Sequence, residues 1–251
     1  MPVVSIVIIC FAGFLGAMVD AIVGGGGLIT TPALLAVGLP VHLALGTNKF
    51  ASSMGTFSSA YHYYKSGNIR MNVLKYLLPF SLIGSSIGVL TVLAIDPEFL
   101  RAIIIFLVII IGLYTLFKKD LGLHDTFSGT TKMKMALAIG VALILGFYDG
   151  FFGPGTGSFL IFALISIFGF DFKKASANSK LMNLTSNATA LFLFLYHGQI
   201  MFSVAIPMAI SMIIGAKVGA ELAIRKGATF IKPVFILVSF SLVIKMAVDL
   251  M

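Results

Sequence analysis

The sequence is poor in charged residues and contains one cysteine. Charged residues occupy 10% of its 251 positions and hydrophobic residues 59%, whereas soluble domains carry about 25% charged residues. This balance excludes an ordinary soluble protein and predicts an integral membrane protein. The single Cys10 excludes a disulfide framework, and its apolar surroundings indicate a packing role.

Several functional motifs are also missing. No extended polar region is present, which excludes a separate soluble catalytic or nucleotide-binding domain. The four histidines are scattered and no Cys pair or H-E-x-x-H motif occurs, so we expect no metal site and no cofactor. The net charge is +8, but most Lys and Arg lie in short loops, where they mark topology and contact lipid headgroups. A nucleic-acid partner is therefore not expected.

Long apolar stretches dominate the chain. A bilayer span needs roughly 20 mainly apolar residues, and the opening "MPVVSIVIICFAGF" lacks a basic n-region, so we interpret it as the first span rather than a signal peptide. Two shorter stretches, 28–38 and 156–170, suit half-helices or re-entrant segments. The predicted fold class is an all-α polytopic membrane protein. The eight long stretches are about 2–22, 41–64, 73–95, 100–118, 133–152, 176–197, 203–224 and 230–250.

The two halves of the chain resemble each other at an offset of about 130 residues. The segment "GFYDGFFGPGTGSF" in the second half matches "GAMVDAIVGGGGLI" in the first. We predict two homologous repeats, 1–118 and 133–251, joined by a cytoplasmic linker at 119–132. The aligned pairs include Asp20 with Asp149, Gly24 with Gly153, Gly26 with Gly155, Lys49 with Lys180, Gly84 with Gly215, and Gly88 with Gly219.

Loop charges indicate that the repeats are inverted. The loop at 65–75 is basic and its equivalent at 197–202 has no Lys or Arg, whereas 224–232 is more basic than its equivalent at 95–101. Because Lys and Arg mark cytoplasmic loops, the halves are expected to have opposite orientations, as in inverted-repeat transporters. Inversion requires an odd number of crossings per half. Either the short segment after the glycines completes a crossing in broken form, or the halves are not inverted.

Glycine-rich breaks interrupt the apolar sequence once in each half. Unwound backbone at membrane depth is tolerated only inside protein or beside a water-filled cavity. Such breaks leave N–H groups near Leu28 and Ser158 to bind an anion at a helix N-terminus. Close helix packing is the alternative role for glycine, but recurrence in both halves favours binding. The candidate residues are Gly24, Gly25, Gly26, Gly27, Leu28, Gly153, Gly155, Thr156, Gly157 and Ser158.

Each half also places a lysine within an apolar span. If its span begins at Val41, Lys49 lies roughly 12 Å inside, where a charge costs about 2.5–3.5 kcal/mol on insertion scales. That cost favours a function, although Lys180, close to the expected helix start, could instead extend to the interface. The candidate binding residues are Thr47, Asn48, Lys49, Asn178, Ser179, Lys180 and Asn183.

Two carboxylates and two amides leave alternatives open. Asp20 and Asp149 could cap the breaks, pair with the lysines, or carry a coupling proton. Asn183 and Asn187 share a helix face, so they could join helices by hydrogen bonds instead of touching substrate.

These residues resemble a known family. The segments "VDAIVGGGGLITTPALLAVGLPVHLALGTNKF" and "GFYDGFFGPGTGSFLIFALISIFGFDFKKASANSKLMNLTSNATAL" are similar to the sulfite exporter TauE/SafE family of anion permeases. One departure is that "GPGTG" replaces the unbroken glycine run in the second half. The family motif corresponds to Gly24–Gly27, Pro32, Thr47, Asn48 and Lys49, and to Gly153, Pro154, Gly155, Thr156, Gly157 and Lys180.

The resemblance implies secondary transport of small anions such as sulfite or sulfonates across the cytoplasmic membrane. We therefore expect a carrier in which Lys49 and Lys180 bind an anion near the bilayer midplane while the repeats rock around it. H⁺ or Na⁺ could act as coupling ion. The alternatives are an anion channel with a lysine selectivity ring and a membrane-embedded enzyme, for which the sequence offers no nucleophile–base or metal constellation.

Overall fold

The computed structural model describes residues 3–99 and 124–226, and within these ranges the chain forms helices and no strands. Four of the helices, α1, α4, α6 and α9, are long and apolar enough to cross a membrane. The predicted all-α membrane fold is confirmed. The helices are α1 (Val3–Val23), α2 (Gly27–Ala36), α3 (Val41–Lys65), α4 (Met71–Leu93), α6 (Lys132–Phe151), α7 (Thr156–Phe168), α8 (Phe172–Tyr196) and α9 (Phe202–Lys226).

The predicted apolar stretches correspond closely to these helices. The short stretches 28–38 and 156–170 are α2 and α7, while 100–118 and 230–250 lie outside the described residues. The largest difference is that α8 begins at Phe172 and not at 176, because the Asp171 side chain caps it by accepting a hydrogen bond from the Lys174 N–H at 2.7 Å. Lys180 therefore lies about two turns inside the helix.

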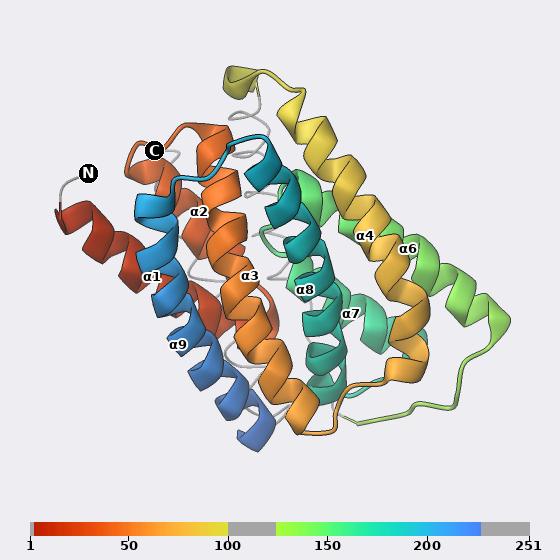
Figure 1. Cartoon of the computed structure of the whole chain (residues 1–251). Coiled ribbons are helices and arrows are strands. Elements are labelled where there is room, and N and C mark those ends of the chain that lie inside the picture. The colour runs from red at the N-terminus through yellow and green to blue at the C-terminus, as the bar shows by residue number, and fades with distance from the viewer. Residues whose placement is uncertain (1–2, 100–123, 227–251) are drawn as a thin grey trace, which may run out of the picture.

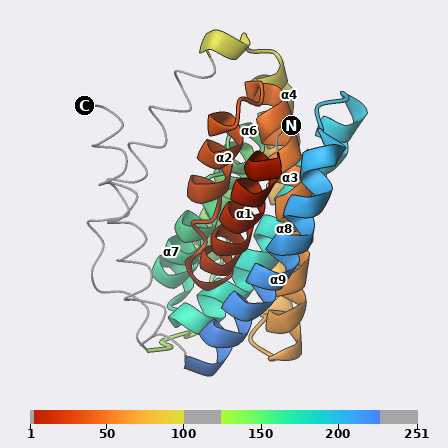
Figure 2. The ribbon, with the colours of Figure 1, turned by 90° about the vertical axis from the view of Figure 1, so that its left-hand side faces the viewer.

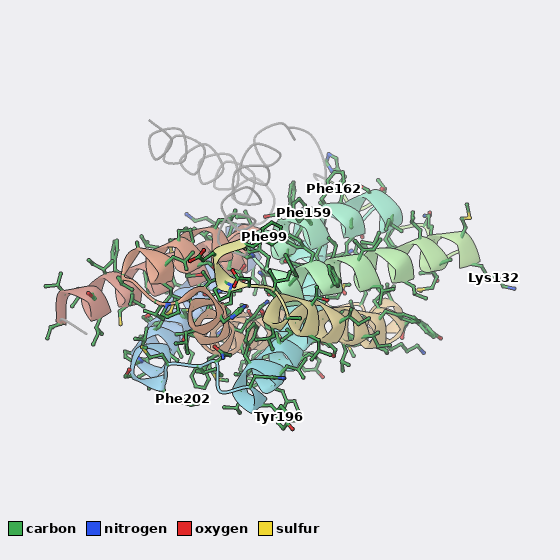
Figure 3. All side chains as sticks on the ribbon, turned by 90° about the horizontal axis from the view of Figure 1, so that it is seen from above. Phe99, Lys132, Phe159, Phe162, Tyr196 and Phe202 are labelled. Carbon is green, nitrogen blue, oxygen red and sulfur yellow. The ribbon has the colours of Figure 1, made fainter. Side chains whose placement is uncertain are left out.

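The two most polar long helices, α3 and α8, lie side by side in the centre of the bundle (Figure 1). They are flanked by α1 and α9 on one side and by α4 and α6 on the other. The outer helices expose large apolar side chains such as Phe11, Ile87 and Ile144, and Figure 3 shows Tyr196 and Phe202 pointing outward. This arrangement suits a lipid bilayer, because polar groups must be satisfied inside the protein while apolar side chains contact the lipid.

Helices that correspond in the two predicted repeats make corresponding contacts. Helix α1 packs against α9, and its counterpart α6 packs against α4. Helices α3 and α8 run in opposite directions in Figure 1, and Figure 2 shows the short helices α2 and α7 on the same side of the bundle. The basic α3–α4 connection and the C-terminal end of α9, with Arg225 and Lys226, lie at the same end.

Glycines allow the outer helices to touch at equivalent positions. A Cβ added to Gly88 on α4 would lie 2.1 Å from the Phe147 carbonyl oxygen of α6. A Cβ added to its equivalent, Gly219 on α9, would lie 2.3 Å from the Met18 carbonyl oxygen of α1. Small residues of this kind let membrane helices approach closely where the hydrophobic effect cannot drive them together.

Gly88→Ala is expected to separate α4 from α6 and to destabilise the protein by about 1–3 kcal/mol, since the new methyl group meets backbone. Gly140→Ala on α6 is the matched control because a Cβ there has nothing within 4 Å. It is expected to be neutral or to gain about 0.5–1 kcal/mol from helix propensity. Melting temperatures of the purified variants in detergent check this, and equal temperatures would contradict the close packing.

Candidate functional site

The two glycine breaks meet in the structure. After α1 ends, the chain turns at Gly24, whose φ is +82°. The Gly24 carbonyl oxygen accepts a hydrogen bond from the Ser158 N–H at 3.2 Å, and the Ser158 hydroxyl donates to the Val23 carbonyl oxygen at 2.8 Å. A Cβ added to Gly27 would lie 2.8 Å from Pro154 Cα. The breaks from the two halves are therefore in direct backbone contact.

The N–H groups that we expected to face an anion have backbone partners. The Leu28 N–H donates to the Gly25 carbonyl oxygen at 3.1 Å, and the Ser158 N–H donates to Gly24. The Gly26 N–H lies 3.4 Å from Asp20 Oδ1, so this carboxylate faces the start of α2. In this conformation these three N–H groups are occupied by acceptors of the protein itself.

Two ion pairs, one buried and one partly buried, join the halves crosswise. Lys49 Nζ on α3 lies 3.0 Å from Asp149 Oδ1 on α6, and Lys180 Nζ on α8 lies 2.7 Å from Asp20 Oδ2 on α1. Each pair combines the lysine of one half with the aspartate of the other. The Lys180 side chain is 0% exposed, so it does not extend to an interface. The pairing partners neutralise both cations, as buried charges require.

A network of polar groups extends from Lys49. Its ammonium donates to Asn187 Oδ1 at 2.9 Å, and the Asn187 amide donates to Asn183 Oδ1 at 2.8 Å. The other oxygen of Asp149 accepts a hydrogen bond from the Ser186 hydroxyl. Asn187, for which the sequence left open a link between helices or a substrate contact, connects α3 to α8 through the buried lysine.

A cavity lies where the glycine breaks approach α3 and α8. Among the described residues, it is lined by nine of the predicted site and coupling residues: Asp20, Gly26, Gly27, Asn48, Lys49, Asp149, Gly153, Gly157 and Asn183. The predicted residues that do not line it are Gly24, Gly25, Leu28, Thr47, Gly155, Thr156, Ser158, Asn178, Ser179 and Lys180. The other lining residues are Asn187, whose role the sequence left open, and five that were not predicted: Ala17, Ser52, Gly55, Thr56 and Met212.

Some predicted residues instead hold the backbone at the ends of helices. The Thr47 hydroxyl accepts a hydrogen bond from the Met201 N–H at 3.0 Å, just before α9. The Asn178 side-chain oxygen accepts one from the Arg70 N–H at 2.8 Å, just before α4. Thr47 and Asn178 occupy equivalent positions in the two halves. Their polar side chains position the helix connections rather than the cavity.

Three of these other lining residues, Ser52, Thr56 and Asn187, share a helix face with residues that were predicted. Ser52 and Thr56 follow Asn48 at intervals of four residues on α3, and residues four apart lie on one face of a helix. Asn187 follows Asn183 in the same way on α8. Extending each predicted motif by two helical turns would have found them.

The polar residues at the cavity differ in their exposure and in their hydrogen bonding. The Asp20 side chain is 20% exposed, whereas the Lys49 side chain is 4% exposed and that of its partner Asp149 2%. Asn48 is 5% exposed, and its side-chain oxygen has no hydrogen-bond partner. Within residues 3–99 and 124–226, no group of three His, Cys, Asp or Glu residues could hold a metal ion.

The outer helices are apolar and surround two polar helices. Glycine breaks and paired charges meet at a cavity between them. Together these features define a polytopic membrane transporter. The chain belongs to the family described as "Sulfite exporter TauE/SafE", which matches residues 9–246.

Curated relatives cover almost the same length of chain. A probable membrane transporter protein of Haemophilus influenzae is 40% identical over 94% of this chain and 92% of its own. Proteins with the same description from a Sinorhizobium species and from Escherichia coli are 38% and 36% identical over 95% and 96% of this chain, and over 90% and 89% of their own. No solved structure matches the chain.

Proposed function

We propose that the protein is a secondary transporter that moves a small anion, sulfite or an organosulfonate, across the cytoplasmic membrane by alternating access. The observation that carries the proposal is the buried Lys49 ammonium at a cavity between the two helix breaks. Its hydrogen bonds to Asp149 and Asn187 hold it in one place. An oxyanion that enters the cavity meets a positioned cation, and charge-assisted hydrogen bonds to an oxyanion are among the strongest available.

The Asp149 carboxylate occupies the place on Lys49 that a substrate oxyanion would take. A sulfite or sulfonate group binds by replacing or sharing this carboxylate oxygen, so the Lys49 ammonium keeps an anionic partner while the buried Asp149 carboxylate loses part of its compensation. Ser186 remains as a hydrogen-bond donor to the displaced carboxylate.

Alternating access would explain why only one of the two corresponding lysines lines the cavity. Lys49 lines the cavity and Lys180 does not. If the halves are inverted repeats, each half can adopt the conformation that the other half has here. The cavity then opens on the opposite side of the membrane, and Lys180 lines it in place of Lys49. The crosswise ion pairs and the equivalent glycine contacts support this relation between the halves.

The proposal predicts that the double variant Lys49→Ala/Asp149→Ala loses anion transport. Removing both partners leaves no unpaired buried charge, while anion affinity is expected to fall roughly ten- to hundredfold, the value of a hydrogen bond to a charged group. The measurements are thermal stabilisation of purified protein by sulfite, sulfate, thiosulfate, sulfoacetate, taurine, acetate and phosphate, and flux in proteoliposomes.

Lys65→Ala is the control, because it removes a lysine in the last turn of α3 that does not line the cavity. This variant should keep wild-type binding and flux. Normal flux in the double variant would contradict the binding site. Electrical current that rises linearly with voltage at high flux would contradict a carrier and indicate an anion channel.

A further inference from the structure

The charges at the cavity balance before any substrate arrives. Lys49 pairs with Asp149, and Lys180 pairs with Asp20. A bound anion therefore adds a net negative charge at membrane depth, where uncompensated charge is costly. A cation that binds with the anion would restore neutrality, so the cavity should contain groups that can hold one. This reasoning rests on the proposed function.

Two residues at the cavity carry acceptor oxygens for a cation: Asp20, which already pairs with Lys180, and Asn48, whose oxygen has no partner. The Asp20 carboxylate is the most exposed of the four paired charges. The Asn48 side-chain oxygen is buried, has no hydrogen-bond partner and belongs to a residue that lines the same cavity. A buried acceptor without a partner carries a desolvation cost of about 1–3 kcal/mol, which a bound ligand would remove. Ser52, one turn after Asn48 on α3, places a hydroxyl on the same face.

The chemistry of these groups favours a hard metal cation over a proton. Carboxylate, amide carbonyl and hydroxyl oxygens are the ligands of hard metal cations. An amide oxygen does not take up a proton under ordinary conditions, so Asn48 would contribute nothing to a proton site. We infer that Asp20 and Asn48 form a Na⁺ site at the cavity, which couples anion transport to Na⁺.

The test measures Na⁺ binding without substrate. Thermal unfolding of the full-length protein in detergent is followed in NaCl and in choline chloride at equal ionic strength. The wild type is expected to show saturable stabilisation by Na⁺ that choline does not give, as for any ligand that binds only the folded state. Asn48→Leu should weaken the Na⁺ response at least roughly tenfold. In choline it should be no less stable than the wild type, because the oxygen it removes has no partner.

Thr31→Val is the matched control. The Thr31 hydroxyl is the other buried side-chain group without a partner among the described residues, and it does not line the cavity. This variant should keep the full Na⁺ response. An equal response in Asn48→Leu and the wild type would overturn the site, as would a wild type that does not distinguish Na⁺ from choline. If Asn48→Leu does not fold, Asn48→Ala provides the same comparison.

Flux in proteoliposomes separates this inference from the proposed function. Substrate accumulation driven by a Na⁺ gradient supports the site. Accumulation that follows a H⁺ gradient and ignores Na⁺ overturns the Na⁺ site and leaves the anion transporter standing. A third outcome is that the protein transports none of the anions but still binds Na⁺, and that Asn48→Leu removes this binding. That outcome would contradict the proposed function and support the cation site.

Discussion

Lys49→Ala alone is expected to destabilise the protein by about 3–5 kcal/mol, and Lys49→Ala/Asp149→Ala is expected to recover most of that loss. The single change leaves the Asp149 carboxylate, 2% exposed, without its cation, and breaking one side of a buried pair has this cost. Removing both partners is often close to neutral. Apparent melting temperatures of the wild type, both single variants and the double variant form the measurement.

The second ion pair supplies the comparison. Lys180→Ala is expected to cost less than Lys49→Ala, because Asp20 is 20% exposed and water can reach its carboxylate. Equal losses for the two lysines would contradict the difference in environment. A double variant that is as unstable as Lys49→Ala would show that the hydrogen bond to Asn187, and not the ion pair, carries the stability.

The sequence predicted which helices, glycine breaks and charged residues form the site better than it predicted which of these residues contact each other. The helices, the two breaks and the buried lysines follow from apolar length, glycine runs and the cost of charge in lipid. The sequence also allowed Asp20 and Asp149 to pair with the lysines. It did not indicate that each pair joins opposite halves, because this depends on how α1 and α6 pack around α3 and α8.

Polar residue type alone did not separate cavity residues from structural ones. Asn48 and Asn178 occur in similar polar segments, but Asn48 lines the cavity and Asn178 binds the Arg70 N–H. The distinction depends on which face of a helix points at which connection, and a one-residue change in position rotates a side chain by about 100°. The N–H groups at the breaks could not be assigned for the same reason, since the opposite break supplies the partner of Ser158.

The contact between the two breaks makes Gly24→Ala a severe change. Gly24 has a φ of +82°, and an added Cβ would lie 2.2 Å from the Gly157 carbonyl carbon. The left-handed conformation costs a non-glycine residue roughly 1–2 kcal/mol, and the overlap with backbone adds about 1–3 kcal/mol. We expect a loss of about 2–5 kcal/mol in stability together with loss of transport, measured by thermal unfolding and by flux.

Two other glycines separate these contributions. Gly67 also has a positive φ, +71°, but nothing lies within 4 Å of an added Cβ, so Gly67→Ala should show the conformational cost alone. Gly157→Ala should show the contact alone, because its Cβ would lie 2.5 Å from Gly24 Cα without a positive φ. If Gly24→Ala costs no more than Gly67→Ala, the breaks do not touch as described. If it approaches the sum of the two controls, the contact between halves is as much a requirement of the fold as the turn itself, and transport must preserve it or exchange it for an equivalent one.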